Sequence, residues 1–313
     1  MQHIAAIDIG TNTIRLLIGH MNNGLLVRIA SDRAVTRLGR NLMKTGLLSA
    51  DSIDKSLNAL RSFKATCDKY NVIKTVAVGT SALREAKNNR DFINTVKNET
   101  GIEIEIISGE REAELTVKGV TAGIGDKKGS GTFFIIDIGG GSTEWILHNS
   151  TFNIHPSSLL MGSFPAGAVK LLETYIKHDP PTPAELDECR NFIYLKLSGS
   201  LDPALLTHDS SLSLIATGGT PTTIAAIDIG LEEYDGEKVY MHCIPSPSLT
   251  AIFNKLVSLP HEERSKVKGM GPERSDIIIP GVLILITIMD YLKTNETVIS
   301  DYGLLEGLLT GAV

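Results

Sequence analysis

The sequence predicts an α/β protein built from two similar halves, and three observations carry this prediction. The chain has 313 residues, about twice the usual length of one domain. Short apolar runs of strand character alternate with segments of helical period, as in α/β layers. An apolar strand ending in Asp-Ile-Gly occurs twice, at Asp8 and at Asp137. A motif repeated about half a chain apart indicates two halves of one design.

Local patterns predict the elements of the first half. Two apolar runs flank a polar glycine turn at residues 10–13, which is typical of two strands joined by a turn. From Asp51 the period changes, and Leu57, Leu60 and Cys67 fall on one helical face. We expect strands over residues 4–9, 14–19, 25–30, 73–78 and 102–107, and helices over residues 51–70, 90–99 and 110–120.

Three further sequence signals predict elements of the second half. The glycine-rich stretch 123–131 indicates a hinge or a turn, and a strand follows over residues 132–137. Residues 182–185 form a capping box with Pro at the first helical position, which predicts a helix to about Leu197. The apolar run 277–289 contains Pro280 and is shorter than a membrane span of about 20 residues, so we expect a buried helix there.

One further copy of the repeated motif is a decoy. Residues 225–230 repeat residues 5–10 letter for letter, but they follow the tetrapeptide Gly-Gly-Thr-Pro. In that setting Thr220 can cap a helix, Pro221 suits its first turn and Gly230 suits its C-cap. We therefore interpret Asp228 as helical and non-catalytic.

The composition excludes several classes of protein. Apolar residues make up 42% and charged residues 21%, which suits a chain with a full core and rules out a disordered tail. The net charge of −6 argues against nucleic acid as a partner. With no basic leader and no long apolar run, we expect a cytoplasmic protein that binds no membrane. The three cysteines lack metal-ligand spacing and are predicted to be reduced and buried.

Glycine turns that follow strands favour a phosphate site. Glycine lets backbone N–H groups approach a phosphate, Ser and Thr hydroxyls add donors, and an Asp at the strand end can hold Mg²⁺. The chain has three such turns, at residues 10–12, 139–143 and 218–220, and the first two follow an Asp. It has neither a Walker loop nor a dinucleotide fingerprint.

Three carboxylates open the helix predicted after Gly109. Glu110, Glu112 and Glu114 either form an acidic first turn that suits the helix dipole, or include a general base. Glu110 and Glu114 share one face of the helix, and Glu112 points elsewhere. The sequence alone does not say which of the three would serve.

Basic residues supply the counter-charge for phosphate. Arg84 follows a predicted strand end and can reach the same site. The dipeptides at residues 178–179 and 208–209 are His-Asp, but they stand in loop composition, and we do not expect them to bind metal. The remaining candidates form a basic cluster that, by itself, is typical of a solvated face: Arg28, Arg33, Arg37, Arg40 and Lys44.

Together these motifs resemble the exopolyphosphatase / guanosine pentaphosphate phosphohydrolase (Ppx/GppA) family. The matching stretches cover residues 7–16, 36–39, 80–86, 107–113, 136–144, 216–220, 271–276 and 300–307. The chain is similar to the short members, which lack the helical domain that longer members add. The resemblance implies an α/β fold of two facing actin-like (ribonuclease H-like) domains, with mixed sheets and flanking helices around a central phosphate cleft.

The resemblance also implies boundaries, a cofactor and partners. An N-terminal actin-like domain would span residues 1–124 and a C-terminal one residues 125–313, with the last helix, about 300–313, packing back on the first domain. The expected cofactor is Mg²⁺, or Mn²⁺ in its place. The expected ligand is inorganic polyphosphate or guanosine pentaphosphate, and we expect a homodimer.

Each candidate residue has a role in this resemblance. Glu112 would be the general base that activates water for attack on a terminal phosphorus. Asp137 and Glu144 would organise the metal and the attacking water, with Asp8 as a further metal ligand on the opposite wall. The phosphates would be held by Gly10, Thr11, Asn12, Arg15, Arg37, Arg84, Gly140, Gly141, Ser142, Thr143, Gly219 and Thr220.

The resulting prediction is an enzyme that releases orthophosphate from the end of polyphosphate and also hydrolyses guanosine pentaphosphate. Leu305 stands where the family usually carries an arginine, which puts one phosphate or packing contact in question. Two alternatives stay open. One is an ATP-dependent small-molecule kinase of the same fold, and the other is a sensor that binds polyphosphate or guanosine pentaphosphate without turnover.

Overall fold

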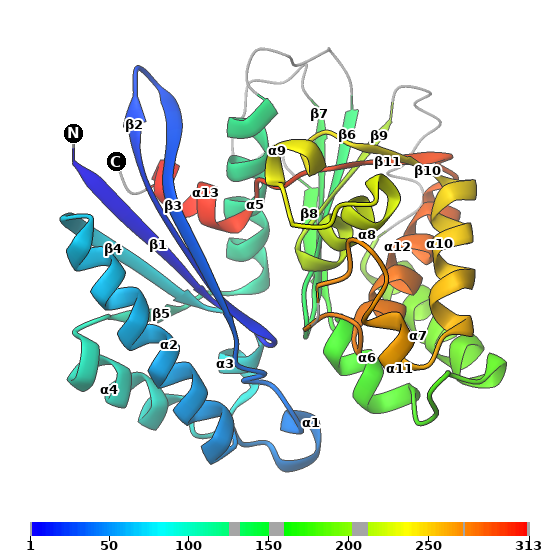
Figure 1. The fold of residues 1–313 in the computed structure, drawn as a ribbon, viewed down its shortest axis with the longest axis horizontal. Helices are drawn as coiled ribbons and strands as arrows, with labels where there is room; N and C mark the ends of the chain where they lie inside the picture. The colour runs from blue at the N-terminus through cyan, green and yellow to red at the C-terminus, as the bar shows by residue number, and fades with distance from the viewer. Residues whose placement is uncertain (1, 125–131, 150–159, 202–211, 272, 312–313) are drawn as a thin grey trace. The chain divides into compact units, whose positions relative to one another are not determined.

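The chain folds into two compact units, and the computed structural model describes residues 2–124, 132–149, 160–201, 212–271 and 273–311 (Figure 1). Unit 1 comprises residues 1–125 and 302–313, and unit 2 comprises residues 126–301. The elements of unit 1 are β1 His3–Ile9, β2 Thr13–Asn22, β3 Leu25–Val35, α1 Leu42–Thr45, α2 Ala50–Lys69, β4 Val72–Gly79, α3 Ser81–Glu85, α4 Asn89–Thr100, β5 Ile104–Ile106, α5 Gly109–Ile124 and α13 Leu304–Gly311. Those of unit 2 are β6 Thr132–Ile138, β7 Thr143–Asn149, β8 Leu160–Phe164, α6 Ala168–Tyr175, α7 Pro183–Ser200, β9 Ser213–Thr217, α8 Gly219–Ile229, α9 Gly236–Val239, β10 Cys243–Pro245, α10 Ser246–Ser258, α11 His261–Arg264, α12 Ile278–Leu292 and β11 Glu296–Ile299.

Both sheets have the same strand order. In unit 1 the order is β3-β2-β1-β4-β5, with β1–β2 and β2–β3 antiparallel and β1–β4 and β4–β5 parallel. In unit 2 the order β8-β7-β6-β9-β11 repeats these directions, and β10 adds an antiparallel edge strand. Two mixed sheets of one topology with flanking helices confirm the predicted fold class. The central cleft stays a prediction.

The sheet of unit 1 is covered on both faces, because successive strand residues point to opposite sides. Ile7 and Ile9 of β1 pack with Phe63 of α2 and Phe92 of α4 on one face. Ala6 of the same strand belongs to a second cluster, on the other face, which α5 and α13 supply with leucines. The strands and helices predicted for this half are present in the structure, with some differences in length. The strand predicted over residues 102–107 is shorter, because only Ile104–Ile106 pairs with β4.

Two glycines let α5 and α13 pack closely. A Cβ on Gly119 of α5 would overlap the carbonyl oxygen of Gly303, and one on Gly307 of α13 would overlap the carbonyl oxygen of Leu115. Neither neighbour is a flexible side chain, so the backbones would have to separate. The close contact between the two helices therefore depends on these two positions.

We expect Gly307→Ala to lower the free energy of unfolding by about 1–3 kcal/mol, because the added methyl overpacks this contact. Gly199→Ala is the matched control, since a Cβ there meets nothing within 4 Å and the residue lies in helix α7. There alanine should be neutral or stabilising, by up to about 1 kcal/mol. Urea unfolding of both variants measures the difference. Equal stability of the two variants would contradict the packing described above.

Unit 2 is built around a nearly all-apolar helix. Residues 278–289 of α12 are buried, and Pro280 lies in its first turn, where a missing N–H leaves no intrahelical bond unmade. Helix α8 ends at Gly230 with φ 75°, and Asp228 lies within it, paired with His242 at 2.7 Å. The buried helix and the helical position of Asp228 are thus both confirmed; its non-catalytic role stays a prediction. No helix in the described residues is long and apolar enough to cross a membrane.

Two local predictions are wrong. Helix α8 begins at Gly219 and its N-cap is Gly218, so Thr220 does not cap it. Gly218 has φ 98°, which glycine tolerates, and the helix therefore starts two residues earlier than predicted. Cys243 is exposed, because its side chain lies on the outer face of the edge strand β10, opposite to the buried Ile244. Cys67 and Cys189 are free and buried as predicted, and burial raises the pKa of Cys189 to about 12. The predicted hinge at 123–131 lies largely outside the described residues.

The predicted capping box opens α7 and is confirmed. Thr182 Oγ1 accepts from the backbone N–H of Glu185, and Glu185 Oε2 accepts from the N–H of Thr182 at 2.8 Å. That N–H, helped by donors from His178 and Lys177, lowers the pKa of Glu185 from 4.5 to about 2. The carboxylate therefore stabilises the fold above pH 4.5, and this contribution is lost as the pH falls toward 2.

We expect Glu185→Ala to unfold at a lower urea concentration than the wild type at pH 7, because the helix loses one of its caps. The difference in urea midpoint between the wild type and the variant should narrow on acidification from pH 4.5 toward pH 3, since protonation of Glu185 removes the same interaction from the wild type. Paired urea titrations at pH 7, 4.5 and 3 measure it. A gap of constant size would show that the carboxylate charge plays no part.

Candidate functional site

The first repeated motif forms the tight hairpin between β1 and β2. The N–H of Gly10 donates to the carbonyl of Thr13 at 3.1 Å, and Asp8 lies opposite Arg15 in the strand register. Arg15 donates through Nε and Nη2 to Asp8 Oδ2, at 3.0 and 2.7 Å. Asp8 Oδ1 is buried and finds no hydrogen-bond partner among the described residues. The Asp8 carboxylate is therefore paired with the Arg15 guanidinium through one of its two oxygens.

The second motif forms the equivalent hairpin between β6 and β7, but with a different pair of charges. The N–H of Gly139 donates to the carbonyl of Ser142 at 3.0 Å, and Asp137 lies opposite Glu144. Residues directly opposite in an antiparallel pair share one face of the sheet. Two acids thus meet where unit 1 has an acid and an arginine, and both are buried.

The carboxylate of Glu144 is held in place by two hydroxyl groups. Ser142 Oγ and Ser163 Oγ both donate to Glu144 Oε1 at 2.8 Å. Ser163 comes from β8 and was missed by sequence reasoning, because the pairing of β8 with β7 brings it opposite Glu144. The sequence of β8, Leu-Met-Gly-Ser-Phe, has no alternation of polar residues that would signal this contact.

The donor set of the second hairpin fits a hard divalent cation. Two facing carboxylates repel each other unless a cation or a proton lies between them, and Mg²⁺ is often bound by one or two carboxylates together with substrate phosphates. In the part of the chain that the structure describes, no group of three or more His, Cys, Asp and Glu side chains is arranged to hold a metal. Asp137 and Glu144 therefore fit a metal that takes its other ligands from water and phosphate. Asp8, paired with Arg15, fits less well.

The turn at Gly139–Ser142 is braced so that its N–H groups stay available. The carbonyls of Gly139 and Gly140 accept from the first N–H groups of α6, at 2.9 to 3.1 Å. In a trans peptide the N–H points opposite to the C=O, so the N–H groups of Gly140 and Gly141 point away from α6. A Cβ on Gly167 would overlap the backbone of Gly140, which shows how closely the two segments approach.

The turn at Gly10–Asn12 is braced in a similar way by the loop after β3. Gly39 donates its N–H to the carbonyl of Thr11 at 2.8 Å, and Arg37 donates its N–H to the carbonyl of Asn12 at 2.9 Å. Arg37 itself has φ 51°, a left-handed conformation that is unfavourable for arginine. The two hydrogen bonds to the turn accompany this conformation. The structure thus brings Arg37, Thr11 and Asn12 together, and their role in binding phosphate stays a prediction.

The third turn, at residues 218–220, lies against two site candidates: Asp137, which was predicted from the sequence, and Arg274, which was not. A Cβ on Gly218 would be 2.6 Å from Asp137 Oδ1, so the turn lies against that carboxylate. A Cβ on Gly219 would overlap the guanidinium of Arg274, and the buried Thr220 packs on α12. Arg274 was missed as a site residue, although its motif at 271–276 was noted, because only the fold brings it to this turn.

Of the three acids that open α5, only Glu112 is buried. Its exposed fraction is 8%, and its Oε2 accepts from Arg84 Nη1 at 2.8 Å, which also donates to the carbonyl of Ile107 at 2.9 Å. Glu110 is exposed, and hydrogen bonds from its own N–H and from Ser108 lower its pKa. Glu114 pairs with Arg111 at 2.6 Å. The structure thus joins Glu112 to Arg84 and leaves the other two acids at the surface.

Two features of unit 1 have structural explanations. Arg28, from the basic cluster, pairs with the buried Glu306 at 2.6 Å and stacks over Tyr302 at 3.7 Å, so it ties β3 to the C-terminal segment. Leu305 is buried in the apolar cluster with Leu115, where an arginine would be out of place. Arg33 and Arg40 are exposed, as on a solvated face.

Comparison with known proteins finds relatives over nearly the whole length. The sequence profile of the Ppx/GppA phosphatase family matches residues 17–313. A bifunctional 3-dehydroquinate synthase/phosphatase of Fusobacterium nucleatum is 30% identical over 99% of this chain, which spans 46% of that relative. Exopolyphosphatase 2 of Mycobacterium tuberculosis is 27% identical, and the match covers 98% of both proteins. The crystal structure of an exopolyphosphatase from Cytophaga hutchinsonii has a TM-score of 0.87 at 28% identity, covering 100% of this chain and 99% of that one.

Proposed function

Since this chain belongs to the Ppx/GppA phosphatase family, we propose that it is an exopolyphosphatase, which releases orthophosphate from the end of inorganic polyphosphate. Two of the relatives described above are exopolyphosphatases, which supports the substrate class. Guanosine pentaphosphate is a further proposed substrate, because it also ends in a phosphoanhydride. The observation that carries the proposal is the buried carboxylate of Glu112, since an acid is rarely buried without a structural or chemical reason.

Glu112 is the proposed general base. A carboxylate in reach of the attacking water accepts the proton that the water loses as its oxygen bonds to the terminal phosphorus, a contribution of typically 10²–10⁴-fold. Arg84 holds this carboxylate in one orientation, because its Nη1 is anchored at the same time on the carbonyl of Ile107. The leaving group is the shortened phosphate chain, which departs with the electrons of the broken anhydride bond.

Asp137 and Glu144 are the proposed ligands of Mg²⁺, or of Mn²⁺, which also prefers oxygen donors. When bound, such an ion stabilises the negative charge that builds up on phosphate oxygens. Ser142 and Ser163 hold Glu144 ready for this role. Arg15, which pairs with Asp8, is proposed to contact phosphate oxygens.

The proposed phosphate grip combines turn N–H groups with guanidinium groups. The N–H groups of Gly140 and Gly141 point away from α6, and turns of this kind bind anions. Arg37 and Arg274 lie beside the first and the third turn. Each charge-assisted hydrogen bond contributes about 1.5–3 kcal/mol, so a few of them suffice for a phosphate chain.

Phosphate release from polyphosphate and from guanosine pentaphosphate, each with Mg²⁺, tests this function. We expect release from polyphosphate and no ATP-dependent phosphorylation of sugars or acetate. Binding of both ligands without release would instead indicate a sensor, and phosphoryl transfer from ATP would indicate a kinase. Light scattering tests the proposed homodimer, and fractionation of cells tests the proposed cytoplasmic location.

A further inference from the structure

Arg274 lies on a tight turn that leads into α12. Its N–H donates to the carbonyl of Gly271 at 2.9 Å, and its own carbonyl accepts from Ile277 at 3.0 Å. Its guanidinium lies against Gly219, at the third glycine turn. The next residue, Ser275, is fully buried. What holds Ser275 therefore also holds the backbone that carries the Arg274 side chain.

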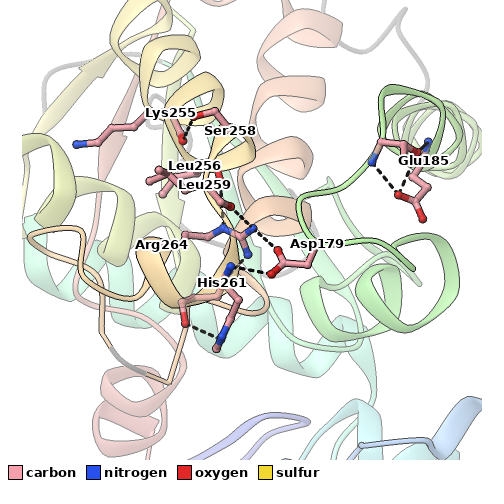
Figure 2. A network of polar contacts seen from close by, with 10 residues as sticks. Asp179, Glu185, Lys255, Leu256, Ser258, Leu259, His261 and Arg264 are labelled. Carbon is pink, nitrogen blue, oxygen red and sulfur yellow. Dashed lines mark hydrogen bonds and ion pairs between the residues drawn. The ribbon is translucent and has the colours of Figure 1, made fainter.

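Ser275 is held by a buried arginine from α11. Arg264 is only 3% exposed, and its Nη1 donates to the carbonyl of Ser275 at 2.9 Å. Its other donors reach the carbonyls of Leu256 and Leu259, at 3.1 and 2.8 Å. Figure 2 shows this guanidinium at the centre of the network, between the end of α10 and Asp179. A buried guanidinium of this kind needs a counter-charge.

Asp179 supplies that counter-charge and a second link to Ser275. Its Oδ1 accepts from Arg264 Nη2 at 2.7 Å, and its Oδ2 accepts from the backbone N–H of His261 at 2.7 Å. His261 Nε2 in turn lies 3.0 Å from Ser275 Oγ. Burial favours the neutral acid, but the bonds from His261 and Arg264 outweigh it and lower the pKa of Asp179, so the carboxylate is charged at neutral pH.

We propose that Asp179 and Arg264 are positioning residues, which hold Arg274 against the Gly218–Thr220 turn and thereby set the affinity for the phosphate chain. The inference rests on the proposed function, because it takes Arg274 as a phosphate contact. Both residues act through Ser275, at its carbonyl and at its hydroxyl. This gives the His-Asp dipeptide at 178–179 a role other than metal binding; its counterpart at 208–209 lies outside the described residues.

The test is Asp179→Asn, which removes the charge but keeps the size of the side chain. Asp179 is 46% exposed in its side chain, and asparagine keeps an oxygen that can accept from Arg264 Nη2, so the variant should fold. We expect the dissociation constant for polyphosphate, measured by calorimetry without metal so that no turnover occurs, to rise about tenfold, as for the loss of a charge-assisted contact. The matched control is Asp290→Asn, which breaks the surface ion pair with Arg190 in the same unit and should leave the affinity unchanged.

A double-mutant cycle separates positioning from a general loss of stability. In an Arg274→Ala background, Asp179→Asn should weaken binding less than about twofold, because the residue it positions is already gone. A full tenfold loss in both backgrounds would overturn the proposal, as would a similar loss in the Asp290→Asn control. In the active enzyme with metal, the change should appear in KM, with kcat within about threefold.

Hydrogen exchange without any substrate gives an independent readout. The backbone amides of residues 273–277 should exchange faster in Asp179→Asn than in the wild type, and unchanged exchange would overturn the positioning role. This measurement also separates the two proposals. If the wild type binds polyphosphate but releases no phosphate, the proposed hydrolysis fails, while the exchange data and the binding cycle still decide the role of Asp179 and Arg264.

Discussion

Glu112→Gln is expected to lower kcat for polyphosphate at least about 100-fold, while the affinity for the substrate changes less than about threefold. Glutamine keeps the size of the side chain and an oxygen that can accept from Arg84, so the local packing is preserved. It cannot take a proton from water, so the chemical step is slowed and binding is not. Single-turnover phosphate release, with binding measured separately, gives both quantities.

Two matched controls come from the same helix. Glu110→Gln and Glu114→Gln alter acids that lie at the surface, and both should retain more than about half of the wild-type rate. A normal rate in Glu112→Gln would remove the general base from the mechanism. A large loss in Glu110→Gln would show that the burial of Glu112 singles out the wrong acid of the three.

Asp137→Asn is expected to reduce activity more than about 100-fold at low Mg²⁺, because it removes one of two facing carboxylates. A second readout does not depend on turnover. Mg²⁺ should raise the Tm of the wild type, since a ligand that binds only the folded state stabilises it, and this rise should shrink or vanish in the variant. Thermal unfolding with and without Mg²⁺ measures it.

The control for this variant is Asp228, which shares the sequence Ile-Asp-Ile-Gly with Asp137. Asp228 stands in the hexapeptide Ala-Ala-Ile-Asp-Ile-Gly, as Asp8 does, but it lies in helix α8 and pairs with His242. Asp228→Asn should leave both the rate and the Mg²⁺-dependent Tm shift unchanged. An equal Mg²⁺ shift in the wild type and in Asp137→Asn would contradict the metal role of the second hairpin.

Much of the fold follows from local patterns in the sequence. The Asp-Ile-Gly motifs at Asp8 and Asp137 lie in equivalent hairpins, because each follows an apolar run of strand character and opens a glycine turn. The copy at Asp228 follows Gly-Gly-Thr-Pro and is helical. Gly230 and the capping box at Thr182 and Glu185 mark helix ends by backbone chemistry that needs no tertiary contact. The start of α8 was placed wrongly because Thr220 is a good cap, whereas Gly218 can adopt a turn closed to other residues.

The candidate site was harder to predict, because it depends on contacts between distant segments. Spacing along α5 sets Glu112 apart from Glu110 and Glu114 but does not say which acid would serve, and the family resemblance points to Glu112. In the structure, burial beside Arg84 distinguishes Glu112 from the other two. Ser163 reaches Glu144 through strand pairing, and Arg274 reaches Gly219 through the packing of the segment before α12. None of these contacts leaves a periodic signal in the sequence.

In the proposed reaction, water attacks the terminal phosphorus of a phosphate chain. Hydrolysis of polyphosphate in water enriched in ¹⁸O, with Mg²⁺, tests it most directly, because mass spectrometry locates the new oxygen atom. We expect orthophosphate that carries one ¹⁸O per molecule, and a chain that shortens from its end without ¹⁸O at the cut. Orthophosphate free of ¹⁸O, or cleavage within the chain, would contradict it.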